Sequence, residues 1–306
     1  MLCIKNGTIH DAVHREAYVA DILVENGKIC RIGENLEAEE TIDASGLNVY
    51  PGFVDAHSHI GLDGYGEPGA DYNEMNDICC PQLRAIDGVD PMDHSFELAR
   101  NAGVTCVCTG PGSANVLGGT FTVIKTAGKR IDDMIVKQAA AMKCAFGENP
   151  KRCYNSKCDS TRMTTAAILR EALMKAQLYL RKKEAAGDDL SKLPPFDMKL
   201  EALIPVLRRE IPLKAHAHRA DDIFTAIRIA KEFGVRLTLE HGTLHGRRPV
   251  ARTCDKGRGT QQVLADAGYS EPRRVPCVHY HGLHRYPAAV SSAVRRYGCL
   301  RGHGSV

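Results

Sequence analysis

The sequence predicts an α/β protein, an incomplete (β/α)8-type barrel preceded by a small β unit, and three observations support this fold class. Residues 1–50 alternate apolar and polar positions around Asn-Gly dipeptides, a pattern typical of β-hairpins. From Pro51 onward, apolar strand-like runs alternate with segments of helical periodicity. Several of these apolar runs end in histidine, at the strand ends where parallel barrels assemble their functional sites.

The first unit is expected to contain short strands over residues 3–11, 19–33 and 39–50. Asn6-Gly7 and Asn26-Gly27 each lie between alternating apolar positions, and both dipeptides favour two-residue hairpin turns. We therefore predict a small β unit with a turn at each of them.

After Pro51 the pattern predicts alternating helices and strands. Helices are expected over residues 94–103, 164–187, 196–210 and 220–234, and strands over 104–110, 212–218 and 235–242. Repeated strand–helix–strand units predict a parallel sheet, and at 306 residues they favour a β/α barrel. The glycine-rich stretch 109–126 matches no phosphate-binding loop, so we interpret it as a strand connection or as a tight loop near a ligand.

Three strand ends carry histidines: His57 and His59, His216 and His218, and His241. Side chains two positions apart share one face of a strand, so each pair points the same way. Imidazoles held on rigid strands are common ligands of divalent metals, although polar residues in a loop after a strand are the simpler interpretation of any one pair. We predict a shared metal site, with His218 as a substrate contact, a ligand of a second metal or a hydrogen-bonding neighbour.

Lys143 lies inside the apolar run 134–150, where an uncompensated ammonium group is costly. One interpretation is a lysine at a strand edge whose charge reaches water. The other is a lysine at the barrel mouth, carbamylated to act as a bridging carboxylate. Glu148, expected in the loop that follows, is a rival oxygen donor.

Composition excludes several classes of protein. No run of about 20 apolar residues is present, and the start lacks the pattern of a secretory signal. The 12 cysteines are scattered, so we expect reduced thiols in a cytoplasmic protein. Residues 244–306 carry 11 Lys and Arg against 3 Asp and Glu, but without an aromatic platform or a helical stripe they predict no specific nucleic-acid binding.

The segments 51–59 (PGFVDAHSH), 213–222 (LKAHAHRADD) and 237–243 (LTLEHGT) resemble the amidohydrolase superfamily, and most closely its imidazolonepropionase-like members. The resemblance covers residues 1 to about 243. It implies that residues 1–50 are part of an N-terminal β-sandwich and that residues 51–243 are a partial (β/α) barrel. It further implies that His57, His59, His216 and His241 bind the metal and that Lys143 matches a carboxylated lysine of the fourth barrel strand.

The family pattern stops after Thr243, and the remaining residues 244–306 form a basic, aperiodic tail. Back-translation of CVHYHGLHRYPAAVSSAV, read one base later, permits VSITTDFTGTPLQYLPLC, which resembles an eighth barrel strand with its Thr-Asp ending. We therefore interpret the chain as truncated by a frameshift near codon 244. The metal-binding aspartate of that strand is then absent, and the catalytic acid–base residue is unknown.

The resemblance implies hydrolysis of a C–N bond in a small amide or cyclic amide by a metal-activated hydroxide. Zinc is the first choice of metal because the predicted ligands are imidazoles, with other divalent ions as alternatives. Activity of this chain is expected to be impaired, and the alternative is a non-catalytic barrel remnant that binds a small molecule or metal. No membrane association is expected, and a homo-oligomer is compatible with the sequence.

Overall fold

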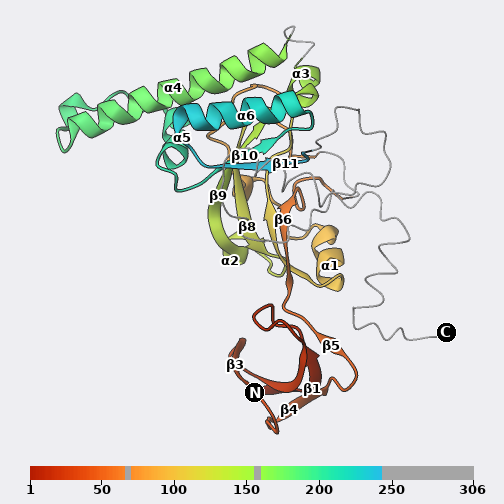
Figure 1. The fold of residues 1–306 in the computed structure, drawn as a ribbon. Helices are drawn as coiled ribbons and strands as arrows, with labels where there is room; N and C mark the ends of the chain where they lie inside the picture. Colours follow the sequence, from red (N-terminus) through yellow and green to blue (C-terminus); the bar gives the residue numbers. More distant parts are fainter. Residues whose placement is uncertain (66–69, 155–159, 243–306) are drawn as a thin grey trace. The chain divides into compact units, whose positions relative to one another are not determined.

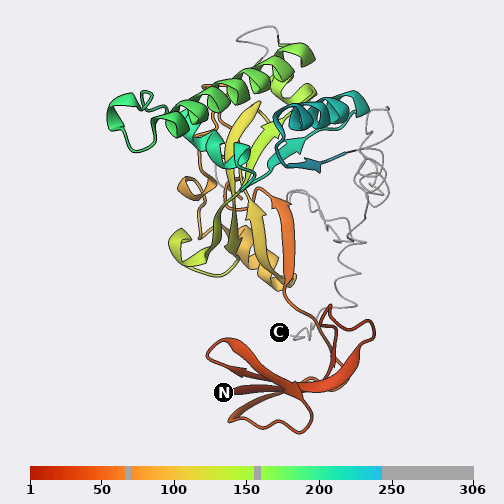
Figure 2. The same ribbon diagram turned by 60° about the vertical axis from the view of Figure 1, so that its left-hand side comes forward.

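The computed structural model describes residues 1–65, 70–154 and 160–242, which form two compact units. One unit comprises Met1–Phe53 with Ala99–Thr105, and the other comprises Val54–Leu98 with the described residues from Cys106 onward. Figures 1 and 2 show the elements of each unit. The predicted basic tail, with its proposed frameshift, lies outside the described residues.

The first unit is built on one five-stranded sheet. Its strands are β1 (Leu2–Ile9), β2 (Tyr18–Glu25), β3 (Lys28–Gly33), β4 (Glu40–Asp43) and β5 (Asn48–Val49). The order is β3-β2-β1-β4, and β5 also pairs with β1. β2 is antiparallel to both β1 and β3, whereas β4 and β5 are parallel to β1.

The two Asn-Gly dipeptides play different roles. Asn26 and Gly27 form the predicted two-residue turn between β2 and β3, with φ angles of 51° and 72°. Asn6 and Gly7 form no hairpin turn, so that prediction is wrong: they lie inside β1, where the register to β2 shifts. Asn6 nevertheless adopts a positive φ of 61°. Asparagine tolerates the left-handed conformation, which occurs at β-bulges as well as in turns.

The second unit contains a six-stranded sheet in the order β11-β10-β9-β8-β7-β6. Its strands are β6 (Phe53–Ser58), β7 (Val104–Thr109), β8 (Leu117–Lys125), β9 (Ile135–Ala145), β10 (Leu213–His216) and β11 (Leu237–Glu240). The strands β9, β10 and β11 run parallel to one another, as expected for strands joined through helices. The predicted strands over 104–110, 212–218 and 235–242 are confirmed as β7, β10 and β11.

The prediction of a parallel sheet is wrong at β8, which is antiparallel to both β7 and β9. Sequence reasoning treated this segment as a connection because of its glycines, but Leu117–Lys125 is a nine-residue strand and almost entirely buried. The glycines serve close packing: a Cβ on Gly119 would lie 2.4 Å from the carbonyl oxygen of Leu83. The sheet is therefore mixed.

The second unit also contains helices. They are α1 (His94–Asn101), α2 (Ile131–Met134), α3 (Glu148–Cys153), α4 (Arg162–Ala186), α5 (Met198–Leu207) and α6 (Ala220–Phe233). Of these, α1, α4, α5 and α6 match the predicted positions closely, whereas the short α2 and α3 were not predicted. Short 3-10 turns cover Ala85–Asp87 and Leu190–Lys192. α4 starts at a capping box formed by Thr161 and Thr164, and α6 ends at Gly234, which adopts the left-handed conformation.

The main core lies between the sheet and the helices α4, α5 and α6, which lie together beside β9, β10 and β11 in both views (Figures 1 and 2). Leu169 and Leu173 of α4 pack with Met142 of β9, Leu213 of β10 and Ile229 of α6, and all five are at most 1% exposed. This burial fixes the carboxyl ends of β9, β10 and β11 relative to one another. None of the helices in the described part of the chain has the length and apolar character needed to cross a membrane.

Candidate metal and substrate site

The predicted histidines lie at the ends of three strands in the second unit. His57 belongs to β6 and His59 follows it directly, His216 is the last residue of β10 with His218 two positions beyond, and His241 follows β11. The parallel ladder places His216 opposite Glu240, the last residue of β11. Local strand geometry therefore delivers these side chains to one rim of the sheet.

The five imidazole rings are neighbours at this rim. Ring centroids are 5.2 Å apart for His57 and His59, 5.1 Å for His57 and His241, 4.5 Å for His216 and His241, 4.5 Å for His216 and His218, and 5.6 Å for His218 and His241. Strands that are up to 184 positions apart in the sequence thus contribute to one cluster. We call these five residues the histidine cluster.

As they stand, the described residues contain no group of three or more His, Cys, Asp or Glu side chains arranged to hold a metal ion. The ligand roles of His57, His59, His216 and His241 therefore remain predictions. Two contacts nevertheless orient rings of the cluster: His59 Nδ1 lies 2.7 Å from the carbonyl oxygen of Gly110, and His218 Nδ1 lies 3.1 Å from that of His241. A carbonyl only accepts, so each of these Nδ1 atoms donates its proton and the Nε2 atom keeps its lone pair.

Burial keeps His57 neutral. His57 is 3% exposed, and its ring stacks on Phe121 with centroids 5.4 Å apart. Burial lowers its pKa far below the ordinary range, and the nearby ammonium groups of Lys143 and Lys214 lower it further. A neutral imidazole is the form that binds metals, so the environment favours the ligand state.

Lys143 lies in β9 and is fully buried. Its Nζ makes no hydrogen bond to any residue that the structure describes, and it lies 5.6 Å from the centroid of the Phe121 ring. Burial lowers its pKa to about 8. The interpretation as a lysine whose charge reaches water is therefore wrong, because both faces of β9 are buried over residues 141–145.

A buried ion pair lies beside His57. Lys214 Nζ of β10 lies 2.6 Å from Oε1 of Glu240 in β11 and 3.1 Å from the carbonyl oxygen of Ala56. The second oxygen of Glu240 is 3.8 Å from Nδ1 of His57. This carboxylate thus stands between an ammonium group and the histidine cluster.

Asp55 is a second buried carboxyl group near these strands. Burial raises its pKa to about 6, although the backbone N–H of His57, which donates to Oδ1 at 3.0 Å, acts in the opposite direction. Asp55 supports the backbone at the start of the His57–His59 pair.

A cavity of about 300 Å³ opens beside the histidine cluster, and His59, His216 and His241 line it. Three residues of α3 also line it: Arg152, Cys153 and Asn149, whose Nδ2 lies 3.2 Å from Nε2 of His216. This volume is at the lower end of the range for small-molecule pockets. The cavity therefore suits a small ligand next to the histidines.

A loop that contributes Tyr72 and Asn73 also lines the cavity, and hydrogen bonds from Asn115 hold this loop in place. Asn115, which is 1% exposed, donates from Nδ2 to the carbonyl oxygens of Glu74 (2.9 Å) and Asp77 (2.8 Å). The hydroxyl of Tyr154 also lies 2.9 Å from this Nδ2. These bonds fix the loop to β8 and α3 through their flanking residues.

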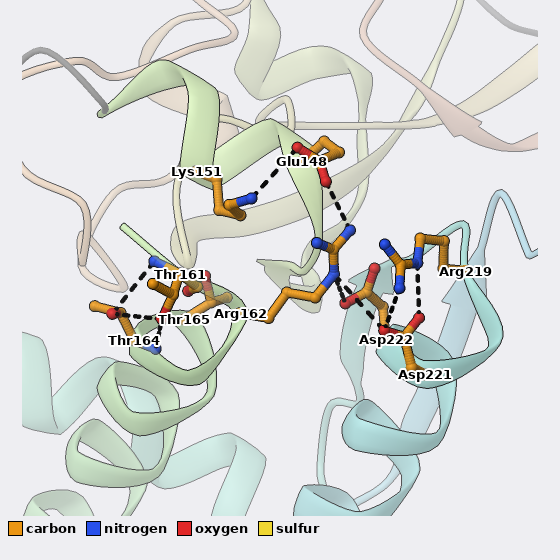
Figure 3. Close-up of polar contacts among 9 residues, drawn as sticks. All are labelled: Glu148, Lys151, Thr161, Arg162, Thr164, Thr165, Arg219, Asp221 and Asp222. Atoms are coloured by element: carbon orange, nitrogen blue, oxygen red, sulfur yellow. Dashed lines mark hydrogen bonds and ion pairs between the residues drawn. The ribbon is translucent and has the colours of Figure 1, made fainter. Parts of the chain in front are cut away.

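Glu148, named as a rival oxygen donor, begins helix α3 instead of lying in a loop. Its carboxylate pairs with Arg162 at 2.8 Å and with Lys151 at 3.6 Å, as Figure 3 shows. Arg162 also binds Asp222 of α6 at 3.0 Å. Glu148 thus takes part in a network that joins α3, α4 and α6, and it does not line the cavity among the described residues.

Sequence reasoning missed Lys214, Asn149 and Arg152. Lys214 had a readable signal, because it lies two positions before His216 in a strand and so shares its face. Asn149 and Arg152 had none, because they lie on the short helix α3, whose placement depends on packing distant in sequence.

Comparisons with known proteins agree with this architecture. The chain is 32% identical over 247 residues to the amidohydrolase tasK of Hapsidospora irregularis, covering 71% of this chain and 25% of that protein. It is 55% identical over 69 residues to an allantoinase of Salmonella paratyphi B, covering 22% of this chain and 14% of that enzyme. No protein-family model matches the chain.

Among solved structures, the chain is similar to an amidohydrolase from Thermotoga maritima, with 45% identity and a TM-score of 0.76. The match covers 79% of this chain and 65% of that one. The fold, the histidine-bearing strand ends and these similarities define the class: the chain belongs to the amidohydrolase superfamily. It spans a quarter of the length of tasK and about two thirds of the Thermotoga protein.

Proposed function

We propose that this chain carries the metal-binding face of a hydrolase that cleaves C–N bonds in small amides or cyclic amides. The observation that supports this most directly is the convergence of His57, His59, His216 and His241 from three strand ends. The similarity to an amidohydrolase and to an allantoinase supports the reaction class.

The spacing of the rings fits a divalent ion. Two imidazoles bound to one tetrahedral ion at about 2.0–2.1 Å place their ring centres roughly 5 Å apart. The pairs His57–His59 and His57–His241 are 5.2 and 5.1 Å apart. We propose zinc because imidazoles are its usual ligands.

A bound divalent ion supplies a Lewis acid and lowers the pKa of water to about 7. The residues of the chain orient the site. Asn149 Nδ2 lies 3.2 Å from Nε2 of His216 and orients that ring. Glu240, which pairs with Lys214, lies beside the ring of His57. His218 donates a hydrogen bond from Nδ1 to the carbonyl oxygen of His241 and so supports the backbone there.

Lys143 is proposed as a further ligand after reaction of its neutral amine with carbon dioxide, which gives a carbamate and releases a proton. A pKa of about 8 supports this proposal, because a substantial fraction of the amine is then neutral near physiological pH. The carbamate would replace a buried amine that has no hydrogen-bond partner among the described residues with a carboxylate that a metal ion could pair with.

No Asp or Glu is among the described residues that line the cavity, so the carboxylate that would relay protons is not assigned. We therefore propose slow turnover for this 306-residue chain. The same observation favours the second candidate, a protein that binds a small molecule or metal at the histidine cluster without hydrolysing it.

The test measures metal content and amide hydrolysis together. The purified chain should retain a divalent metal, and His57→Ala or His216→Ala should lose most of it, whereas His94→Ala, an exposed histidine on α1, should not. Hydrolysis of N-acyl amino acids, hydantoin or allantoin by the metal-loaded chain favours the hydrolase, and stabilisation by these ligands without products favours the binding protein. Full metal content in both cluster variants would refute the proposed site.

A further inference from the structure

The charge of the cavity beside the histidine cluster carries an inference about the substrate. Among the described residues that line it, Arg152 is the one side chain with a permanent charge, and no Asp or Glu is present. The other polar lining residues include Tyr72, Asn73 and Asn149, which are neutral. The described residues that line the cavity therefore carry a net positive charge.

Arg152 differs from the two cations near it. Lys151 pairs with Glu148, and Arg162 pairs with Glu148 and Asp222, on the side of α3 that Figure 3 shows. The guanidinium group of Arg152, by contrast, makes no hydrogen bond or ion pair with the part of the chain that the structure describes, and the residue is exposed. The acidic residues around α3 thus neutralise its neighbours and leave the guanidinium group of Arg152 to the cavity.

The placement of Arg152 on α3 favours recognition over nonspecific attraction, because the helix itself is held in position. α3 is held to α4 and α6 by the ion pairs of Glu148 and Asp222 with Arg162. One turn earlier on the same helix, Asn149 contacts His216. The short helix therefore presents a guanidinium group and a contact to the proposed metal ligands in the same small cavity.

We propose that Arg152 binds a carboxylate of the substrate, so that the substrate is a small amide that carries a carboxylate near its scissile C–N bond, such as an N-acyl amino acid. A planar guanidinium group binds a carboxylate through two parallel charge-assisted hydrogen bonds, and the exposed Arg152 at the edge of the cavity is free to form such a pair. This inference rests on the proposed function for the position of the scissile bond, but the carboxylate site itself does not require hydrolysis.

Binding by the full-length chain tests the inference. Titration calorimetry would compare N-acetylalanine with its uncharged analogue N-acetylalaninamide, with and without added Zn²⁺. The wild-type chain should bind the carboxylate form at least about tenfold more tightly, as expected for a charge-assisted bidentate pair. Arg152→Gln should reduce this preference to within about twofold, and Arg152→Lys should be intermediate because an ammonium group makes no planar fork.

Arg181→Gln is the matched control, because Arg181 is an exposed arginine on α4 that does not line the cavity. It should keep the full preference. Equal binding of the two ligands, no binding of either, or a preference that persists in Arg152→Gln would overturn the inference; the last result would indicate a carboxylate bound by the histidines or by Zn²⁺.

The two proposals fail separately. Selective binding that depends on Arg152, without any hydrolysis, would keep the carboxylate site and count against the hydrolase. Hydrolysis of neutral cyclic amides that is unchanged by Arg152→Gln would keep the hydrolase and refute the carboxylate site. If both hold, Arg152→Gln should raise KM for N-acetylalanine more than it lowers kcat.

Discussion

Lys214 Nζ lies 2.6 Å from Glu240 Oε1, and the two side chains are 7% and 5% exposed. The pair joins neighbouring strands, since Lys214 belongs to β10 and Glu240 to β11. The other carboxylate oxygen faces His57, so this ion pair links the core of the sheet to the histidine cluster. Its removal should affect both stability and metal binding, which permits separate tests.

Lys214→Met should destabilise the chain by about 3–5 kcal/mol, because it removes the cation closest to a buried carboxylate. The double variant Lys214→Met with Glu240→Leu should recover most of this loss, because apolar residues of similar volume replace a buried ion pair at little cost. Urea unfolding followed by circular dichroism measures both. A single variant as stable as wild type would show that the pair contributes nothing.

Glu240→Gln should weaken metal binding by roughly 10- to 100-fold, as is usual when a carboxylate that orients a metal-binding histidine is removed. The expected cause is a looser or reoriented His57 ring. Competition with a chromophoric chelator measures the affinity. Glu171→Gln is the control, because Glu171 pairs with Lys175 on the exposed surface of α4; an equal loss in both variants would contradict the prediction.

Asp21 should stabilise the first unit in a pH-dependent way. Its carboxylate accepts the backbone N–H groups of Asn6 at 2.8 Å and Leu36 at 3.0 Å, and these bonds lower its pKa. A lowered pKa means that the stabilisation is present above the unfolded value of about 3.9 and is lost as the pH falls through the folded value.

Asp21→Asn should therefore accelerate amide hydrogen exchange in β1 and β2 at neutral pH. The difference from wild type should shrink as the solution is acidified through the folded pKa. Glu25→Gln, a change at an exposed end of β2, should leave the exchange rates unchanged. A difference that grows on acidification would contradict this prediction.

Gly119→Ala should destabilise the second unit strongly. Gly119 has a φ of 105°, and the added Cβ would lie 2.4 Å from the carbonyl oxygen of Leu83, so both strain and a backbone clash result. Gly27→Ala is the matched control. Gly27 also has a positive φ, of 72°, but no atom lies within 4 Å of a Cβ added there. We expect a clearly lower melting temperature for Gly119→Ala than for Gly27→Ala, and similar values would contradict the packing role.

The periodic parts of the fold were predictable because they depend on local sequence. The helices at α1, α4, α5 and α6 follow from a 3.6-residue pattern, and β10 and β11 follow from short apolar runs that end in histidine. β8 escaped prediction because its glycines are typical of loops, and their use in close packing against Leu83 is visible only in three dimensions.

By itself, the sequence determined which histidines lie at strand ends, because each of them follows a short apolar run. It also determined which of them share a face, because side chains alternate along a strand. Tertiary structure alone decided which of these ends meet, how the buried Lys214 finds Glu240 across two strands, and why Arg152 faces the cavity while Lys151 does not. The physical reason is that burial and charge pairing depend on neighbours brought together by packing, and those neighbours are distant along the chain.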